Sequence, residues 1–322
     1  MLNEKMVGLG SRRSVIREIF EYGKKRKAEI GEENVFDFSL GNPSVPTPAA
    51  VTATLERIIK ETDPVKLHGY TSAQGDMAVR AKIAGSIEER FGFPANKDLI
   101  YMTCGAAASL TVTLNALINS GDEIIIPSPF FPEYRVFAEN AGAHVVTVQC
   151  RKPDFQLDIK ATENAVTEKT KAIIINSPNN PTGAVFSPDT IKALSDMLCK
   201  KQAEYGTDIY IIADEPYREL SYGAEVPYIP KYYANTVICY SYSKSLSLPG
   251  ERIGYIFIPE GAADCRKLYA AVCGAGRALG FVCAPSLMQY TVAECTDVLP
   301  DISAYKENRD LLFGALTDYG YE

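Results

Sequence analysis

Histidine is nearly absent from this chain, which has only His68 and His144 among its 322 residues. A zinc site built on three histidines is therefore excluded, and a Ser-His-Asp triad would have to use one of these two side chains. We interpret both histidines as structural, and we expect no metal site. The eight cysteines include no CxxC pair, a pattern typical of free thiols in a reduced, cytoplasmic protein.

Long basic runs and long apolar runs are also missing. Lys and Arg total 33 against 40 for Asp and Glu, a net charge of −7, so we expect no nucleic-acid partner. The apolar stretch at residues 269–285 contains Arg277 and several glycines, and it is shorter than the roughly 20 residues that a membrane span needs. The charged N-terminus lacks the apolar segment of a secretory signal. We therefore expect no membrane partner.

From about residue 97 onward, short apolar runs alternate with helical patterns. Strands are predicted at residues 122–126, 143–148, 172–176, 209–213, 236–240 and 254–258. Most of these are continuous apolar runs, as expected for strands buried on both faces. Helices are predicted at residues 76–90, 107–118 and 187–205. The alternation predicts an α/β fold, with a mostly parallel central sheet and helices on both faces.

Polar segments follow three of these strands, and ligands bind beyond the carboxyl ends of strands in such sheets. SPNNPTG follows residues 172–176, DEPY follows 209–213, and SYSKSLSLPGERIG follows 236–240. A further segment, GAAAS, joins a short strand to a helix. Together these loops offer a lysine, an arginine, a carboxylate, an asparagine, a phenol and several hydroxyls. The set favours an aromatic aldehyde that carries a phosphate.

The phosphate and the aldehyde select different members of this set. A phosphate is stabilised by free N–H groups at a helix start, by hydroxyl donors and by a bidentate guanidinium. The residues expected to bind it are Gly105, Ala106, Ala107, Ser241, Ser243 and Arg252. Lys244 could form a Schiff base with the aldehyde. Asp214 could hold a ring nitrogen protonated, and Tyr217 and Asn180 could bond a ring oxygen.

The chain resembles a fold-type I pyridoxal-phosphate enzyme, close to the class I/II aminotransferases. Lys244 and Arg252 lie 252 − 244 = 8 residues apart in SYSKSLSLPGERIG. The other motifs that carry the resemblance, all in the family's order, are SLGNPSVPTP, YTSAQGDMAVR, GAAAS, PSPFFPEY, NNPTG and DEPY. The resemblance implies pyridoxal 5'-phosphate as the cofactor, and amino acids and 2-oxo acids as substrates.

The resemblance also implies a role for individual residues. Lys244 becomes the Schiff-base lysine and the proton-transfer catalyst, and Asp214 becomes the partner of the ring nitrogen. Asn180 and Tyr217 become contacts of the ring 3-oxygen, with Asn180 also near the substrate. The remaining implied contacts are Phe131 stacked on the ring (with Phe130 or Tyr134 as rivals), Gly41 on the substrate carboxylate, and Tyr70 on the cofactor phosphate of a neighbouring subunit. The last contact implies a homodimer with shared active sites.

The resemblance implies three parts of the chain. Residues 1–48 form an N-terminal arm and part of a small domain, residues 49–290 the large cofactor-binding domain, and residues 291–322 the start of a small α/β domain that is expected to be truncated. The family's arginine for the substrate carboxylate has no counterpart here, so we expect the chain alone to be poorly active. Arg277 hints at an acidic substrate, but a surface or helix-end role is the favoured interpretation.

The main hypothesis is therefore transamination between an L-amino acid and a 2-oxo acid by a ping-pong mechanism. Two alternatives on the same scaffold are a carbon–sulfur β-lyase and an amino-acid decarboxylase, because the cofactor residues barely distinguish these reactions. A remoter alternative is a non-catalytic regulatory domain that binds pyridoxal phosphate. The segment before Val35 is too short for the DNA-binding module that usually precedes such domains.

Overall fold

A seven-stranded sheet organises the second of two structural units. The computed structural model describes residues 2–11 and 15–321, and internal contacts divide the chain into residues 1–44 and 45–322. The strands are β1 (Ile100–Thr103), β2 (Glu123–Ser128), β3 (His144–Gln149), β4 (Thr170–Asn176), β5 (Tyr210–Asp214), β6 (Thr236–Ser241) and β7 (Gly254–Phe257). Their order is β1-β7-β6-β5-β4-β2-β3, and among the described strands β7 alone runs opposite to the other six. The predicted mostly parallel sheet is confirmed.

The central strands are buried on both faces, as their continuous apolar sequences predict. Every residue of β5 and β6 is buried. Successive side chains alternate between two cores: Ile211 lies in one and Ile212 in the other. Asp214 lies two residues beyond Ile212 and shares its face of the sheet. This alternation therefore places the Asp214 carboxylate on the same face of the sheet as the Ile212 side chain.

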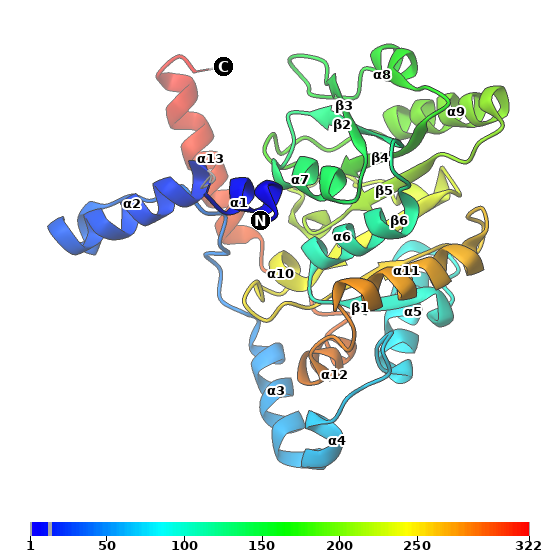
Figure 1. The fold of residues 1–322 in the computed structure, drawn as a ribbon. Coiled ribbons are helices and arrows are strands. Elements are labelled where there is room, and N and C mark those ends of the chain that lie inside the picture. Colours follow the sequence, from blue (N-terminus) through cyan, green and yellow to red (C-terminus); the bar gives the residue numbers. More distant parts are fainter. Residues whose placement is uncertain (1, 12–14, 322) are drawn as a thin grey trace. The chain divides into compact units, whose positions relative to one another are not determined.

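Helices cover both faces of the sheet (Figure 1). One core contains residues of α3 (Ala49–Glu61), α5 (Met77–Phe91), α9 (Pro188–Tyr205) and α12 (Ser286–Glu294), with α8 (Ile159–Ala165) packed at its margin. The other contains residues of α6 (Ala106–Leu117), α7 (Glu133–Asn140) and α11 (Cys265–Leu279). Figure 1 shows α6 and α11 side by side on this second face. Helices on both faces confirm the predicted fold class.

The long helices begin and end where capping chemistry predicts. The Ser187 hydroxyl accepts a hydrogen bond from the backbone N–H of Thr190, and Pro188 fills the first turn of α9. Gly206 then ends α9 in the left-handed conformation. The three predicted helices are observed at 77–91, 106–117 and 188–205, each within one residue of its expected bounds. The strand predictions likewise match β2 to β7, with small shifts at their ends.

The remaining elements are short or terminal. The first unit contains α1 (Glu4–Ser11), α2 (Val15–Ile30) and the 3-10 helix η1 (Glu32–Asn34). The second unit also contains α4 (Pro64–His68), α10 (Tyr242–Ser245), α13 (Ser303–Asp318) and the 3-10 helices η2 (Lys97–Leu99), η3 (Arg218–Leu220) and η4 (Ile229–Lys231). Within the described ranges, no helix combines the length and apolar character needed to cross a membrane.

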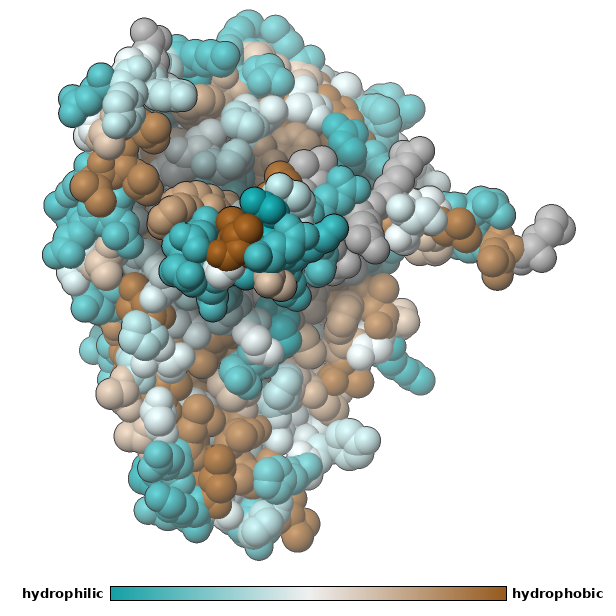
Figure 2. All heavy atoms as spheres, turned by 90° about the vertical axis from the view of Figure 1, so that its left-hand side faces the viewer, coloured by the Kyte–Doolittle hydropathy of each residue, from teal (hydrophilic) through white to brown (hydrophobic). Residues whose placement is uncertain are grey.

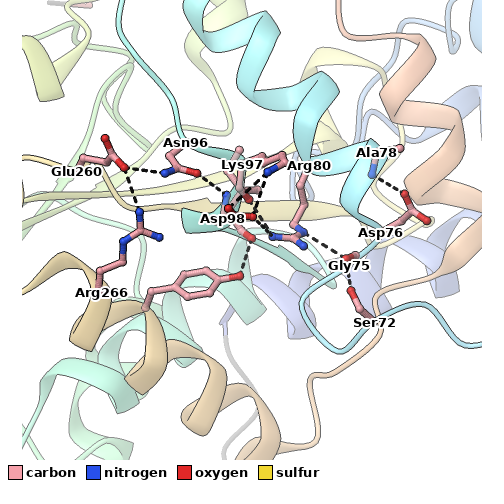
Figure 3. Close-up of polar contacts among 12 residues, drawn as sticks. Ser72, Gly75, Asp76, Ala78, Arg80, Asn96, Lys97, Asp98, Glu260 and Arg266 are labelled. Atoms are coloured by element: carbon pink, nitrogen blue, oxygen red, sulfur yellow. Dashed lines mark hydrogen bonds and ion pairs between the residues drawn. The ribbon is translucent and has the colours of Figure 1, made fainter.

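A polar network ties the loop before α5 to the loop before β1 (Figure 3). The Arg80 guanidinium donates to the carbonyl oxygen of Gly75 at 3.2 Å and to that of Lys97 at 2.9 Å. The Asp76 carboxylate caps α5 by accepting from two backbone N–H groups, and its own N–H donates to the Gln289 side chain at 2.8 Å. These bonds fix the loop at residues 72–76, which begins two residues after Tyr70.

Candidate active site

The carboxyl ends of β4, β5 and β6 meet at one edge of the sheet. Asn176 pairs with Asp214 in the strand register, and Asp214 pairs with Cys239, two residues before the end of β6. The loops that leave these ends carry Asn180, Tyr217 and Lys244. Because parallel neighbours end together, the sheet brings the three predicted segments to a single place.

Asp214 is a buried carboxylate with one oxygen bonded and one unbonded. Its side chain receives the Tyr134 hydroxyl on Oδ2 at 2.5 Å, whereas Oδ1 has no hydrogen-bond partner among the described residues. Burial raises the pKa of Asp214 to about 7, although the Tyr134 hydrogen bond opposes this rise. An unbonded buried oxygen is rare in proteins and calls for an explanation.

The raised pKa of Asp214 predicts a pH dependence of stability for the protein without added ligands. The folded state binds this proton more tightly, so the contribution of Asp214 is greatest below about pH 4 and is lost as pH rises towards about 7. We expect a loss on the order of a few kcal/mol over that window. Urea unfolding at about pH 5 and pH 8 measures it. Between these two pH values, the free energy of unfolding of Asp214→Asn should fall less than that of wild type. An equal fall in both proteins would contradict the raised pKa of Asp214.

Asn180 and Tyr217 contact each other directly, and Asn176, a residue that the sequence analysis missed, joins their loops. The Asn180 side-chain amide donates to the Tyr217 hydroxyl at 3.3 Å. The Asn176 side chain accepts from the backbone N–H of Asn180 at 2.7 Å and donates to the backbone carbonyl of Asp214 at 2.9 Å. Asn176 therefore couples the two loops. Burial, followed by the charge of Asp214, raises the pKa of the Tyr217 phenol.

Lys244 lies in α10, the single helical turn that follows β6. The Ser241 hydroxyl caps this turn: it accepts the Ser243 backbone N–H at 3.0 Å and donates to the Ser243 hydroxyl at 2.7 Å. The Lys244 side chain is half-buried, and burial lowers its pKa. A larger neutral fraction makes the amine a better nucleophile.

The predicted phosphate-binding residues also come together. Gly105 precedes α6 with φ +84°, and a Cβ there would lie 2.9 Å from Nη2 of Arg252. A Cβ at Gly254 would lie 2.3 Å from the carbonyl oxygen of Tyr240 and 3.1 Å from Cα of Gly105. Both glycines thus permit a close approach of the β7 start to the α6 start. The Arg252 guanidinium thus lies beside Gly105, the residue that precedes Ala106 and Ala107 at the start of α6.

The remaining predicted residues have different surroundings. Tyr70 is 98% exposed in the described chain, and Gly41 belongs to the first unit. Arg277 is an exposed residue in the last turn of α11, a placement that agrees with the helix-end interpretation. Phe131 packs edge-on against Tyr134, with ring centroids 5.6 Å apart, and Phe130 and Phe131 are both half-buried. The stacking role and the Gly41 and Tyr70 contacts stay predictions.

A buried ion pair between Glu215 and Arg218, to which the sequence analysis gave no role, holds the turn that carries Tyr217. Arg218 donates to the two Glu215 carboxylate oxygens at 2.7 and 2.5 Å, and to two backbone carbonyls at 2.9 Å. Its guanidinium lies 5.2 Å from the ring centroid of Phe91 and 5.4 Å from that of Tyr228. The turn is therefore held by a residue before Tyr217 and by a residue after it in the sequence.

Removing Arg218 should destabilise the protein strongly, because it leaves the Glu215 charge buried without its partner. We expect Arg218→Ala to lower the free energy of unfolding by about 3–5 kcal/mol. Urea denaturation monitored by circular dichroism measures the change. Arg151→Ala is the control, since Arg151 pairs with Asp154 at the surface, where a pair contributes about 0–1 kcal/mol. If both variants lost the same free energy of unfolding, the buried pair would contribute no more to stability than the surface pair.

The sequence and the fold of this chain are both similar to those of known proteins. Residues 33–318 match the family model of aminotransferases of class I and II. An amino transferase from Eubacterium rectale is 56% identical and has a TM-score of 0.97, with 100% of this chain and 81% of that chain covered. Aspartate aminotransferase from Thermotoga maritima is 28% identical with a TM-score of 0.84, covering 98% and 80%.

A curated relative leads to the same family. A probable aspartate aminotransferase from Methanocaldococcus jannaschii is 28% identical over 313 residues, which cover 95% of this chain and 77% of that protein. The matched region includes every segment gathered at the ends of β4, β5 and β6. This chain therefore belongs to the class I and II aminotransferases.

Proposed function

We propose that the constellation at the ends of β4, β5 and β6 binds pyridoxal 5'-phosphate and that the enzyme uses it to transfer an amino group from an L-amino acid to a 2-oxo acid. The observation that carries the proposal is the unbonded, buried Oδ1 of Asp214 at the same sheet edge as Lys244. A ring nitrogen that carries a proton would satisfy this oxygen.

The other residues fit the same group. Its anionic phosphate suits the α6 start, Arg252 and the two serine hydroxyls, which are all donors. Its ring oxygen suits Asn180 and Tyr217, which lie within hydrogen-bond distance of each other. The phosphate, the ring oxygen and the ring nitrogen would therefore each have their own binding residues in this site.

When bound, pyridoxal phosphate supplies an electrophilic aldehyde and a ring that withdraws electrons. In this chain, Lys244 would hold the aldehyde carbon covalently, and after displacement by the substrate its amine would carry the proton between two carbon atoms of the substrate and cofactor. The lowered pKa of Lys244 favours the neutral amine that both tasks require. Asp214 would keep the ring nitrogen protonated, and Arg252 would hold the phosphate in place.

Borohydride trapping tests the proposal directly. The protein is incubated with pyridoxal phosphate, reduced with borohydride and digested, and the modified peptide is identified by mass spectrometry. We expect one adduct, on Lys244, together with a visible absorbance band that an amino-acid substrate removes. An adduct spread over exposed lysines, with no band that responds to any amino acid in a panel, would refute the proposed site. The panel also identifies the preferred substrate.

The surface near α3 and α4 supports a homodimer. Figure 2 shows apolar side chains among hydrophilic ones in the lower part of the view, where α3 and α4 lie. The exposed apolar residues of this region are Ile59, Val65, Tyr70 and Met77. We propose that they contact a second subunit and that Tyr70, beside the loop fixed by Arg80, reaches its cofactor phosphate. Light scattering measures the assembly; a monomer at micromolar concentration would contradict this proposal.

A further inference from the structure

Tyr134 is a buried phenol whose hydroxyl reaches the candidate active site from a helix with no other predicted role. The side chain is 2% exposed and belongs to the core between the sheet and α6, α7 and α11. Its hydroxyl donates to Oδ2 of Asp214, 80 residues further along the chain. Its backbone N–H also donates to the carbonyl oxygen of Phe131 at 3.1 Å. The phenol is thus held in place by packing and by its own turn.

We propose that Tyr134 is a positioning residue that keeps Asp214 ionised and reserves Oδ1 for the ring nitrogen of the cofactor, thereby setting how far that nitrogen is protonated. The inference rests on the proposed function. It assigns to Tyr134 a role through Asp214, distinct from the stacking considered for this ring in the sequence.

The hydrogen-bond donor to the Asp214 carboxylate sets how strongly that carboxylate binds a proton. A carboxylate has two oxygens, and the Tyr134 hydroxyl occupies only Oδ2. A hydrogen bond to the charged form of an acid stabilises that form and lowers its affinity for a proton. A proton shared between Asp214 and a ring nitrogen therefore stays on the nitrogen. Without the hydroxyl, burial and the charge of Glu215 act on Asp214 unopposed, and both make the carboxylate the better base.

The other titratable groups near Asp214 do not replace this donor. Glu215 follows Asp214 in the chain but is bonded to Arg218. The Tyr217 hydroxyl accepts from Asn180 and its pKa is raised. Cys239, the register partner on β6, contacts the Thr113 hydroxyl, and burial raises the pKa of its thiol. Tyr134 is accordingly the donor to Asp214 among the described side chains.

The test measures the ring-nitrogen proton itself rather than turnover. Wild type and Tyr134→Phe are loaded with ¹⁵N-labelled pyridoxal phosphate, and the ring ¹⁵N chemical shift is recorded by NMR. Loss of a hydrogen bond to a charged acceptor shifts such an equilibrium roughly 10-fold. We expect the ¹⁵N signal of Tyr134→Phe to move towards the unprotonated value, and kcat to fall by a similar factor.

Tyr233→Phe provides the matched control. Tyr233 is also buried, and its hydroxyl donates to the backbone carbonyl of Ile209 at 2.7 Å, so its loss removes a core hydrogen bond without touching Asp214. The ¹⁵N signal of this variant should equal that of wild type. A shift of equal size in both variants would show a general effect of core destabilisation and would overturn the inference.

Two further measurements keep the outcome decisive. Borohydride trapping on Lys244 is run on each protein: if wild type shows no adduct, the proposed function fails, whereas an adduct with unchanged ¹⁵N shifts refutes only the role of Tyr134. Should Tyr134→Phe not fold, 3-fluorotyrosine at position 134 replaces it. Its more acidic phenol is a stronger donor, so the ring nitrogen should become more protonated; a shift in the opposite direction would also refute the inference.

Discussion

Lys244→Ala is expected to lower the transamination rate by about 10⁴-fold, the upper end of the contribution of a positioned acid–base group. The variant would lose both tasks that the proposed function assigns to Lys244, the covalent attachment of the cofactor and the movement of the proton. No other lysine occurs among the motif residues gathered at the ends of β4, β5 and β6. The rate is measured with the amino acid that wild type converts best, at saturating cofactor.

The control for this variant is Lys192→Ala. Lys192 is an exposed residue of α9 that pairs with Asp196. It should keep the wild-type rate and the borohydride adduct on Lys244. If Lys244→Ala retained more than a hundredth of the wild-type rate, or if it still formed a single adduct on another lysine, Lys244 would not be the residue that carries the cofactor.

Asp214→Asn is expected to reduce kcat by roughly 10²- to 10³-fold, comparable with the loss of one preorganised electrostatic contact in other active sites. An amide has no charge to balance a protonated ring nitrogen, so the ring withdraws electrons less well. Because Asp214 is buried with one oxygen unbonded, the same substitution should not lower stability at pH 8. Activity and stability should therefore change independently.

Steady-state kinetics and urea unfolding at the same pH separate these two effects. Asp196→Asn, on the exposed face of α9, serves as the control and should change neither quantity. A parallel loss of stability and activity in Asp214→Asn would assign a structural role to the carboxylate. A wild-type kcat would remove Asp214 from the catalytic machinery altogether.

The sequence predicted the fold and the gathering of the site because both depend on local signals. Continuous apolar runs identify buried strands, and the polar segments directly after them must lie at one edge of a parallel sheet. Lys244, Asp214, Asn180 and Tyr217 were predicted in this way. Their loops do lie at the ends of β4, β5 and β6.

Contacts between distant residues could not be predicted from the chain alone. Nothing in PSPFFPEY indicates that the Tyr134 hydroxyl reaches Asp214, because the contact depends on how α7 packs on the sheet. Glu215 and Arg218 had no predicted role, but the tertiary fold buries both and places the Arg218 guanidinium near the rings of Phe91 and Tyr228. The roles of Gly41 and Tyr70 and the cytoplasmic location stay predictions.

The reversed direction of β7 has a consequence for variation among sequences of this type. It brings the start of β7 close to Gly105, with the Arg252 guanidinium alongside, so that neither Gly105 nor Gly254 has room for a side chain. Insertions or deletions at residues 245–253 would displace the guanidinium, so this segment should hold a constant length. Turns at the opposite edge of the sheet, such as the one after Gly206, are free to vary and offer places to attach a label.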